Sequence, residues 1–354
     1  MRSSTFRLAR NAVYSMPKRA YSTQDSKVRH LMTIGDLSPA ELSKLVLNAA
    51  AYKKAVKNSN GGRGVDPALT GKTVAMMFSK RSTRTRVSTE AAVTLLGGHP
   101  MFLGKDDIQL GVNESVYDTS RVISSMTSCM VARVGPHLEI SQLAKASSVP
   151  VINALSNDFH PLQTIADFLT IHETFAAEGT TGGSIIPPGL KIAWVGDANN
   201  VLFDLAIACL KLGVHISVAT PRGYEIPLHM KDFIESNTKD SETPGLLTEH
   251  HIPEAAIKDA DIIVTDTWVS MGQEAESKKR LRAFEGFQVT NELAARGGAK
   301  PDWKFMHCLP RHAEEVADEV IYSHRSLVFP EAENRLWAAL AALEAFVVNK
   351  GQII

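Results

Sequence analysis

The segment TVAMMFSKRSTRTRVSTEAAVTLLGG, residues 73–98, contains the pattern that decides the fold class. Its first six residues form a short apolar run, which is typical of a buried strand in a parallel sheet. A helix is expected from about residue 84 to residue 96, because two glycines follow it and act as a stop signal. A strand, a polar turn and a helix in this order form the unit from which parallel α/β sheets are built.

The same alternation continues on both sides of this segment. Ser38 and Glu41 form a capping box around Pro39, which predicts the start of an amphipathic helix. Further strands are expected near residues 129–134, 149–155, 192–195, 216–219, 262–265 and 305–308, and further helices near residues 158–178, 201–212 and 331–348. The sequence therefore predicts an α/β fold with two doubly wound parallel-sheet domains joined by interdomain helices.

Length and composition limit the possible classes of protein. The chain has 354 residues, which is too long for one core and suits two domains. With 38 basic and 38 acidic residues the formal net charge is zero, so nothing suggests a nucleic-acid partner. No apolar run reaches the roughly 18 to 20 residues that a membrane-spanning helix needs. The three cysteines, Cys129, Cys209 and Cys308, lack paired spacing, which argues against a disulfide framework and a zinc site.

The first 24 residues differ in composition from the rest of the chain. They contain five basic residues and no acid, which is typical of a mitochondrial presequence. A disordered basic tail is the alternative interpretation, but acids occur at normal density from Asp25 onward. We therefore expect a presequence at residues 1–24, a first domain at 25–160 that is joined by the C-terminal helix 331–354, and a second domain at 161–330.

The sequence STRTR, residues 82–86, follows the first strand and opens a helix. Backbone N–H groups at a helix start attract anions, and the hydroxyl and guanidinium groups of this motif add further donors. The motif predicts a phosphate cradle that lacks the glycines of a P-loop. The alternative is a basic helix start on the surface.

Two further motifs lie at helix starts. HPLQ, residues 160–163, begins the long helix near the expected domain boundary; its histidine could polarise a carbonyl and its glutamine could bond an amide. A single histidine is more often structural. VGDANN, residues 195–200, follows a strand in the ligand-binding position of an open α/β sheet. Its single glycine and its two bulky asparagines argue against a dinucleotide site.

The second half of the chain contains three more polar motifs. DTWVSMG, residues 266–272, begins with an acid at the end of a strand, where it could bind a substrate ammonium. HCLPR, residues 307–311, also follows a strand; its cysteine is either functional or a small buried hydrophobe. ENR, residues 333–335, lies just inside the final helix.

Together these six segments resemble the aspartate and ornithine carbamoyltransferase family, over nearly the whole chain from about Leu31 to the final helix. STRTR and HPLQ resemble motifs that the whole family shares, whereas DTWVSMG and HCLPR resemble motifs of its ornithine branch. With the presequence, the chain resembles the mitochondrial type from eukaryotes. The resemblance implies carbamoyl transfer from carbamoyl phosphate to the δ-amine of L-ornithine, which gives L-citrulline and phosphate, in the mitochondrial matrix.

The resemblance also implies roles for individual residues. The residues implied in catalysis are Arg133, His160, Asp266 and Cys308, with Arg133 and His160 bonding the carbonyl oxygen. Those implied in carbamoyl-phosphate binding are Ser82, Thr83, Arg84, Thr85, Gln109, Arg133, His160, Gln163, Cys308, Leu309 and Arg335. Those implied in ornithine binding are Asn199, Asn200, Asp266, Ser270 and Met271. The first domain would bind carbamoyl phosphate and the second ornithine, and Gln109 would reach a neighbouring subunit in a homotrimer.

The implied chemistry needs no metal and no organic cofactor, and it involves no nucleic acid and no membrane. Three other functions compete with it. A nicotinamide dehydrogenase would need a glycine-rich turn, and an amino-acid-binding module would need no phosphate cradle. Aspartate carbamoyltransferase would need basic residues where this chain has Asp266 and Met271.

Overall fold

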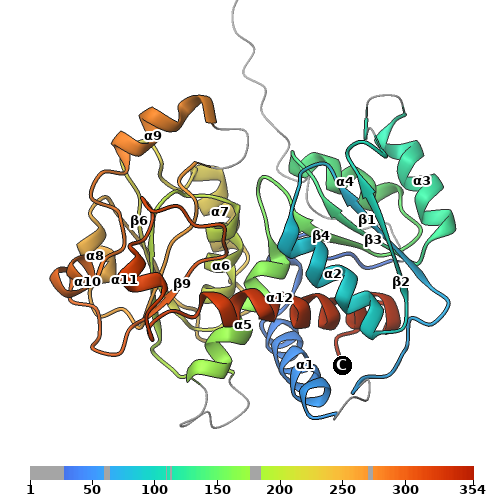
Figure 1. The fold of residues 1–354 in the computed structure, drawn as a ribbon, viewed down its shortest axis with the longest axis horizontal. Helices are drawn as coiled ribbons and strands as arrows, with labels where there is room; N and C mark the ends of the chain where they lie inside the picture. The colour runs from blue at the N-terminus through green and yellow to red at the C-terminus, as the bar shows by residue number, and fades with distance from the viewer. Residues whose placement is uncertain (1–27, 60–63, 109, 112–113, 176–184, 270–273) are drawn as a thin grey trace, which may run out of the picture.

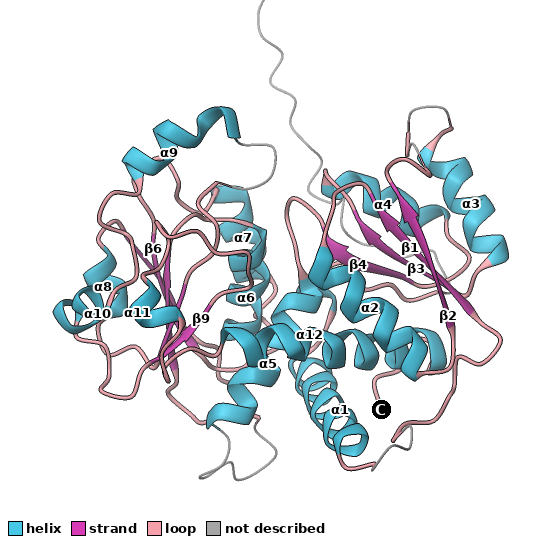
Figure 2. Cartoon of the chain, in the orientation of Figure 1, coloured by secondary structure: helices cyan, strands magenta, loops and turns pink. Residues whose placement is uncertain are grey.

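The computed structural model describes residues 28–59, 64–108, 110–111, 114–175, 185–269 and 274–354, so the predicted presequence lies outside the described residues. Two parallel sheets stand side by side, each with helices packed around it (Figures 1 and 2). The first sheet has the strand order β2-β1-β3-β4, and the second has the order β7-β6-β5-β8-β9. The strands are β1 (Thr73–Phe78), β2 (His99–Gly104), β3 (Cys129–Arg133), β4 (Val151–Leu155), β5 (Lys191–Val195), β6 (His215–Ala219), β7 (Leu247–His250), β8 (Ile262–Val264) and β9 (Lys304–Met306).

The helices follow the strands as the alternating pattern predicts. They are α1 (Pro39–Lys57), α2 (Thr83–Leu95), α3 (Val116–Met126), α4 (His137–Ala146), α5 (Pro161–Phe175), α6 (Asn200–Lys211), α7 (Leu228–Ser236), α8 (Pro253–Ile257), α9 (Ser277–Ala283), α10 (Asn291–Gly297), α11 (Asp318–Ile321) and α12 (Val328–Leu343). Within the described part of the chain, none is both long and apolar enough to cross a bilayer.

Helices α5 and α12 connect the two halves of the molecule. α12 runs from the second sheet toward the first and packs against α5, α2 and α1 (Figure 1). α5 is buried without interruption from Pro161 to Ile171, since it is enclosed from both sides. One continuous core cluster contains residues of both halves, from Leu31 to Phe346. The predicted fold class, two parallel-sheet domains joined by helices, is confirmed.

In each sheet, the direction in which the chain adds new strands reverses at one point. This reversal determines where loops can form a site. In the first sheet the chain moves outward from β1 to β2 and then returns to place β3 on the other side of β1. In the second sheet the same reversal occurs between β5 and β8. In open α/β sheets, ligands bind at the carboxyl edge beside such a reversal, so the loops after these strands are where a site is expected.

The expected strand at residues 73–78 has the observed bounds, and the other expected elements lie within a few residues of theirs. Edge strands β2 and β7 were not predicted: β7 carries no apolar run, and the apolar run of β2 is limited to Pro100–Leu103. Their residues are only partly buried, because an edge strand of this kind is not enclosed as a central strand is. α12 begins at Val328, before the expected residue 331, and includes Pro330 in its first turn, where no N–H group is needed.

Candidate active site

The start of α2 lies at the switch point of the first sheet, because Phe78 at the end of β1 pairs with Arg133 at the end of β3. Ser82 is the N-cap of α2, and its Oγ accepts a hydrogen bond from the backbone N–H of Thr85 at 3.3 Å. A cavity of about 680 Å³ opens beside this loop, and its lining includes Ser82 and Thr83. The predicted cradle is therefore a helix start that opens into a cavity.

The two arginines of STRTR have different surroundings. Arg86 is exposed; it bonds Glu90 at 2.8 Å, and its guanidinium lies 3.7 Å from the centre of the Phe102 ring. Arg84 is half-buried, and its charge lowers the pKa values of Arg133, His160 and Arg335. Arg84 is therefore the arginine of the motif that belongs to the buried group of cations.

Three buried side chains near Arg84 have a nitrogen atom without a partner among the described residues: Nε of Arg133, Nε of Arg335 and Nδ1 of His160. Burial, followed by neighbouring positive charge, lowers the pKa of both guanidiniums to about 10, so both remain charged near neutral pH. Burial and the three arginines lower the pKa of His160 well below its usual value, so its ring is neutral. Buried unpaired donors are rare, and this group is suited to an anionic ligand.

Arg335 links three helices at this point. Its Nη1 donates to Oε1 of Gln163 on α5 at 2.5 Å, and its Nη2 donates to Oγ1 of Thr85 on α2 at 3.3 Å. Gln163 and Arg335 are almost fully buried. The structure thus brings together Arg133, His160, Gln163 and Arg335, which come from β3, the β4–α5 loop, α5 and α12.

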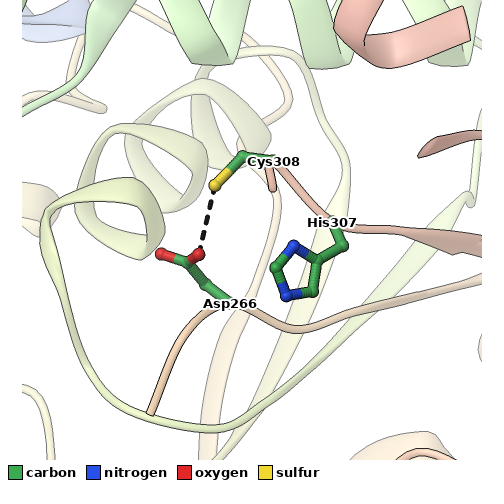
Figure 3. Close-up of side chains that lie close together, drawn as sticks. All are labelled: Asp266, His307 and Cys308. Carbon is green, nitrogen blue, oxygen red and sulfur yellow. Dashed lines mark hydrogen bonds between the residues drawn. The ribbon is translucent and has the colours of Figure 1, made fainter. Parts of the chain in front are cut away.

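The second group of predicted residues lies at the carboxyl edge of the second sheet. Asp266 follows β8, and one of its oxygens accepts a hydrogen bond from Sγ of Cys308 at 3.1 Å (Figure 3). The other oxygen accepts from Nδ2 of Asn199 at 2.7 Å. Burial, and then the charge of Asp266, raises the pKa of the Cys308 thiol well above its usual value. Cys308 is therefore a protonated thiol that donates to a carboxylate, not a thiolate.

Asp266, His307 and Cys308 each have one possible metal-ligand atom within 4.8 Å of the others (Figure 3). Both nitrogens of His307 already have partners, however. Nε2 lies 3.0 Å from Oε2 of Glu315, and Nδ1 accepts a hydrogen bond from the backbone N–H of Leu309 at 2.9 Å. A metal would have to displace one of these bonds, so the geometry favours an acid–thiol pair with a supporting histidine.

The two groups are close enough to influence the same side chain, because the charges of Arg335 and of Asp266 both act on the pKa of Asp167. Asn200, also predicted in the site, donates from Nδ2 to the backbone carbonyl of Ser156 at 2.6 Å and so spans the two halves. Leu309 has a φ of 60°, an unusual left-handed conformation for this residue type. The predicted residues Gln109, Ser270 and Met271 lie outside the described residues.

Three buried acids of this region were not predicted: Asp167, Glu315 and Glu331. Asp167 lies four residues after Gln163, and Glu331 lies four residues before Arg335, so helical spacing was an available signal. Glu315 accepts hydrogen bonds from His312 and from the backbone of Trp268, besides its contact with His307, and it has no comparable spacing.

Comparison with known proteins covers nearly all of the described chain. The family model "Aspartate/ornithine carbamoyltransferase, carbamoyl-P binding domain" matches residues 29–173, and the model for the "Asp/Orn binding domain" of the same family matches residues 188–346. A protein of Coccidioides immitis named "Ornithine carbamoyltransferase, mitochondrial" is 69% identical over 332 residues, which are 93% of this chain and 95% of that protein. One of the same name from Schizosaccharomyces pombe is 54% identical over 329 residues, covering 92% and 96% of the two chains.

Solved structures agree with these matches. A crystal structure of a mitochondrial ornithine carbamoyltransferase from Coccidioides immitis has a TM-score of 0.86 and 66% identity, and covers 92% of this chain and 100% of that chain. The ornithine carbamoyltransferase from Pyrococcus furiosus has a TM-score of 0.81 and 43% identity, and the match covers 91% of this chain and 97% of that chain. The resemblance found from the six motifs is confirmed: the chain belongs to the aspartate/ornithine carbamoyltransferase family.

Proposed function

We propose that this protein transfers the carbamoyl group of carbamoyl phosphate to the δ-amine of L-ornithine, which gives L-citrulline and phosphate. The observation that carries the proposal is the pairing of two groups across the domain boundary. The unpartnered buried nitrogens of Arg133, His160 and Arg335 suit an anionic substrate. The carboxylate of Asp266, held by Asn199 and Cys308, suits a cationic one.

The first group would hold carbamoyl phosphate. Ser82, Thr83, Arg84 and Thr85 supply hydroxyl, guanidinium and backbone donors for the phosphate. Arg133 and the neutral ring of His160 would bond the carbonyl oxygen, where negative charge develops when the amine attacks. Gln163 and the backbone at Cys308 and Leu309 would orient the carbamoyl NH₂ group, and Arg335 would add positive charge near the leaving phosphate.

The second group would hold ornithine. Asn199, Asn200 and Asp266 contribute amide and carboxylate groups, and Ser270 and Met271 are predicted from the sequence to complete the site. The δ-ammonium has a pKa near that of lysine, roughly 10.4, so it must lose a proton before attack. Because the Cys308 thiol is already protonated, it cannot accept that proton. The departing phosphate is the better acceptor for the final proton, and Asp266 and Cys308 would position the amine.

The aspartate alternative is not favoured. Aspartate carries a side-chain carboxylate, which would meet the carboxylate of Asp266 and be repelled by it. The relatives from Coccidioides immitis and Schizosaccharomyces pombe are both named ornithine carbamoyltransferases, which also supports the ornithine branch.

The larger organisation follows from the same proposal. We infer that residues 25–160, with the C-terminal helix 331–354, bind carbamoyl phosphate, and that residues 161–330 bind ornithine. The names of both fungal relatives include "mitochondrial", which supports the matrix as the location and residues 1–24 as the presequence. We further infer a homotrimer in which Gln109 reaches a neighbouring site. The proposed chemistry needs no metal or organic cofactor.

The test is a product assay with purified protein and saturating carbamoyl phosphate. Citrulline should form with ornithine, and no N-carbamoylaspartate should form with aspartate. Product from aspartate, or no turnover with ornithine by a folded protein, would refute the proposal.

A further inference from the structure

Two carboxyl groups that the mechanism does not use lie buried beside Gln163. Asp167 of α5 and Glu331 of α12 are 4% and 2% exposed. The side chains are hydrogen-bonded to each other, and burial together with each other's proximity raises the pKa of Glu331 well above its usual value. Two carboxyl groups in contact cannot both ionise without a large cost, so this pair holds one proton and one negative charge.

The pair fixes the orientation of the Gln163 amide. Nε2 of Gln163 donates to Oδ1 of Asp167 at 2.8 Å and to Oε1 of Glu331 at 3.0 Å. Its Oε1 accepts from Arg335 at 2.5 Å. A flipped amide would set its oxygen against the carboxyl oxygens and its NH₂ against a guanidinium, so only one orientation satisfies every group.

In this orientation the amide oxygen of Gln163, a hydrogen-bond acceptor, faces Arg335 and the other buried cations. An amide oxygen has two lone pairs, and Arg335 uses one of them. The NH₂ of a carbamoyl group donates hydrogen bonds, whereas the methyl of an acetyl group cannot. Acetyl phosphate otherwise has the same phosphate and carbonyl groups as carbamoyl phosphate, so the atom that meets Gln163 is what distinguishes the two compounds.

We propose that the Asp167–Glu331 pair is a positioning device that locks the Gln163 amide as an acceptor and thereby selects carbamoyl phosphate over acyl phosphates without an N–H group. The inference rests on the proposed function and adds a determinant of its substrate specificity. Glu331 also accepts a hydrogen bond from the backbone N–H of His307 at 3.0 Å. The same acid therefore fixes both Gln163 and the strand end that leads to Cys308 and Leu309.

Two variants of equal charge separate this role from a structural one. Asp167→Asn keeps Oδ1 for Gln163 and gains an NH₂ that can donate to an ionised Glu331. Glu331→Gln has only one oxygen for two donors, the Gln163 amide and the His307 backbone. Each variant leaves one negative charge in the pair, but only Glu331→Gln forces an N–H group against a donor.

The experiment measures binding of carbamoyl phosphate, acetyl phosphate and inorganic phosphate to each protein by calorimetry, without ornithine. The ratio of carbamoyl to acetyl phosphate affinity should fall about tenfold in Glu331→Gln, the effect of one lost hydrogen bond to a buried group. In Asp167→Asn the ratio should change less than about threefold. Inorganic phosphate should bind both variants as it binds the wild type.

The inference would be overturned if Glu331→Gln kept the wild-type ratio of carbamoyl to acetyl phosphate affinity. It would also be overturned if that ratio fell equally in both variants. If Glu331→Gln does not fold, nuclear magnetic resonance of the wild type decides. The Gln163 side-chain NH₂ signals, assigned from their loss in Gln163→Leu, should then be protected from solvent exchange; free exchange would overturn the inference. A wild type that binds carbamoyl phosphate but forms no citrulline would instead refute only the proposed function.

Discussion

At the residue scale, the two arginines of STRTR make a matched pair. Arg84→Ala should lower the affinity for carbamoyl phosphate by a factor of about 30 or more, because a desolvated charge-assisted contact contributes about 2 kcal/mol or more. Arg86→Ala should change it less than about threefold, because Arg86 is exposed and bonds Glu90 instead. Calorimetry with carbamoyl phosphate measures both. Equal effects would mean that Arg84 is not a specific ligand.

Asp266 and Cys308 allow a second comparison at this scale. Asp266→Asn should reduce turnover with ornithine by about a hundredfold or more, because an uncharged amide neither pairs with an ammonium nor keeps both present partners. Cys308→Ser should be milder, since a hydroxyl still donates to Asp266. Carbamoyl-phosphate binding should change little in either variant. Steady-state kinetics and calorimetry together test this, and full turnover in Asp266→Asn would show that the ornithine site is wrongly assigned.

At the scale of elements, Asp204 connects three segments. From α6, its oxygens accept from Oγ1 of Thr33 at 2.6 Å, from the backbone of Ile34 at 2.8 Å and from the backbone of His160 at 2.7 Å. It thereby holds the backbone of His160, the residue that precedes α5. Burial raises the pKa of Asp204 from 3.8 to about 7.

This raised pKa predicts a dependence of stability on pH. Between about pH 4 and pH 7 the folded protein binds a proton at Asp204 that the unfolded chain has released, so this residue's contribution to stability falls as pH rises. Above pH 7 the contribution is constant. Urea unfolding of the wild type and Asp204→Asn should show a free-energy difference that decreases across this window. A difference that stays constant from pH 4 to pH 7 would contradict the prediction.

Elements and side-chain contacts differed in how far the sequence predicted them. Central strands such as β1 are enclosed on both faces, so their composition is apolar and their bounds were readable. Edge strands β2 and β7 are partly exposed, and neither has the continuous buried pattern of β1. The six motifs located the site because loops at strand ends and helix starts carry its polar groups. The helical spacing of Asp167 and Glu331 placed each acid beside a motif residue, but it could not report that Glu331 meets Gln163 across 168 residues of sequence.

At the scale of the whole molecule, the proposed trimer gives a further prediction. Sedimentation should detect a homotrimer. Mixed trimers of Arg84→Ala and Gln109→Ala chains should recover part of the activity that each variant lacks, because some sites would be free of both changes. The measurement is citrulline formation after joint refolding, with each variant refolded alone as the control. Full activity in a monomer would rule the arrangement out.

The two ends of the described chain contact each other. Arg29 donates to the backbone carbonyl of Gly351 at 2.9 Å, and its guanidinium lies 5.6 Å from the centre of the Phe346 ring. Ribosomes make proteins from the N-terminus, so Arg29 and α1 emerge long before the helix against which they pack. The first half cannot complete its core until the last residues have been made, because α12 packs against α1 and α2. A nonsense codon close to the end of the gene would therefore damage the half of the enzyme that was made first.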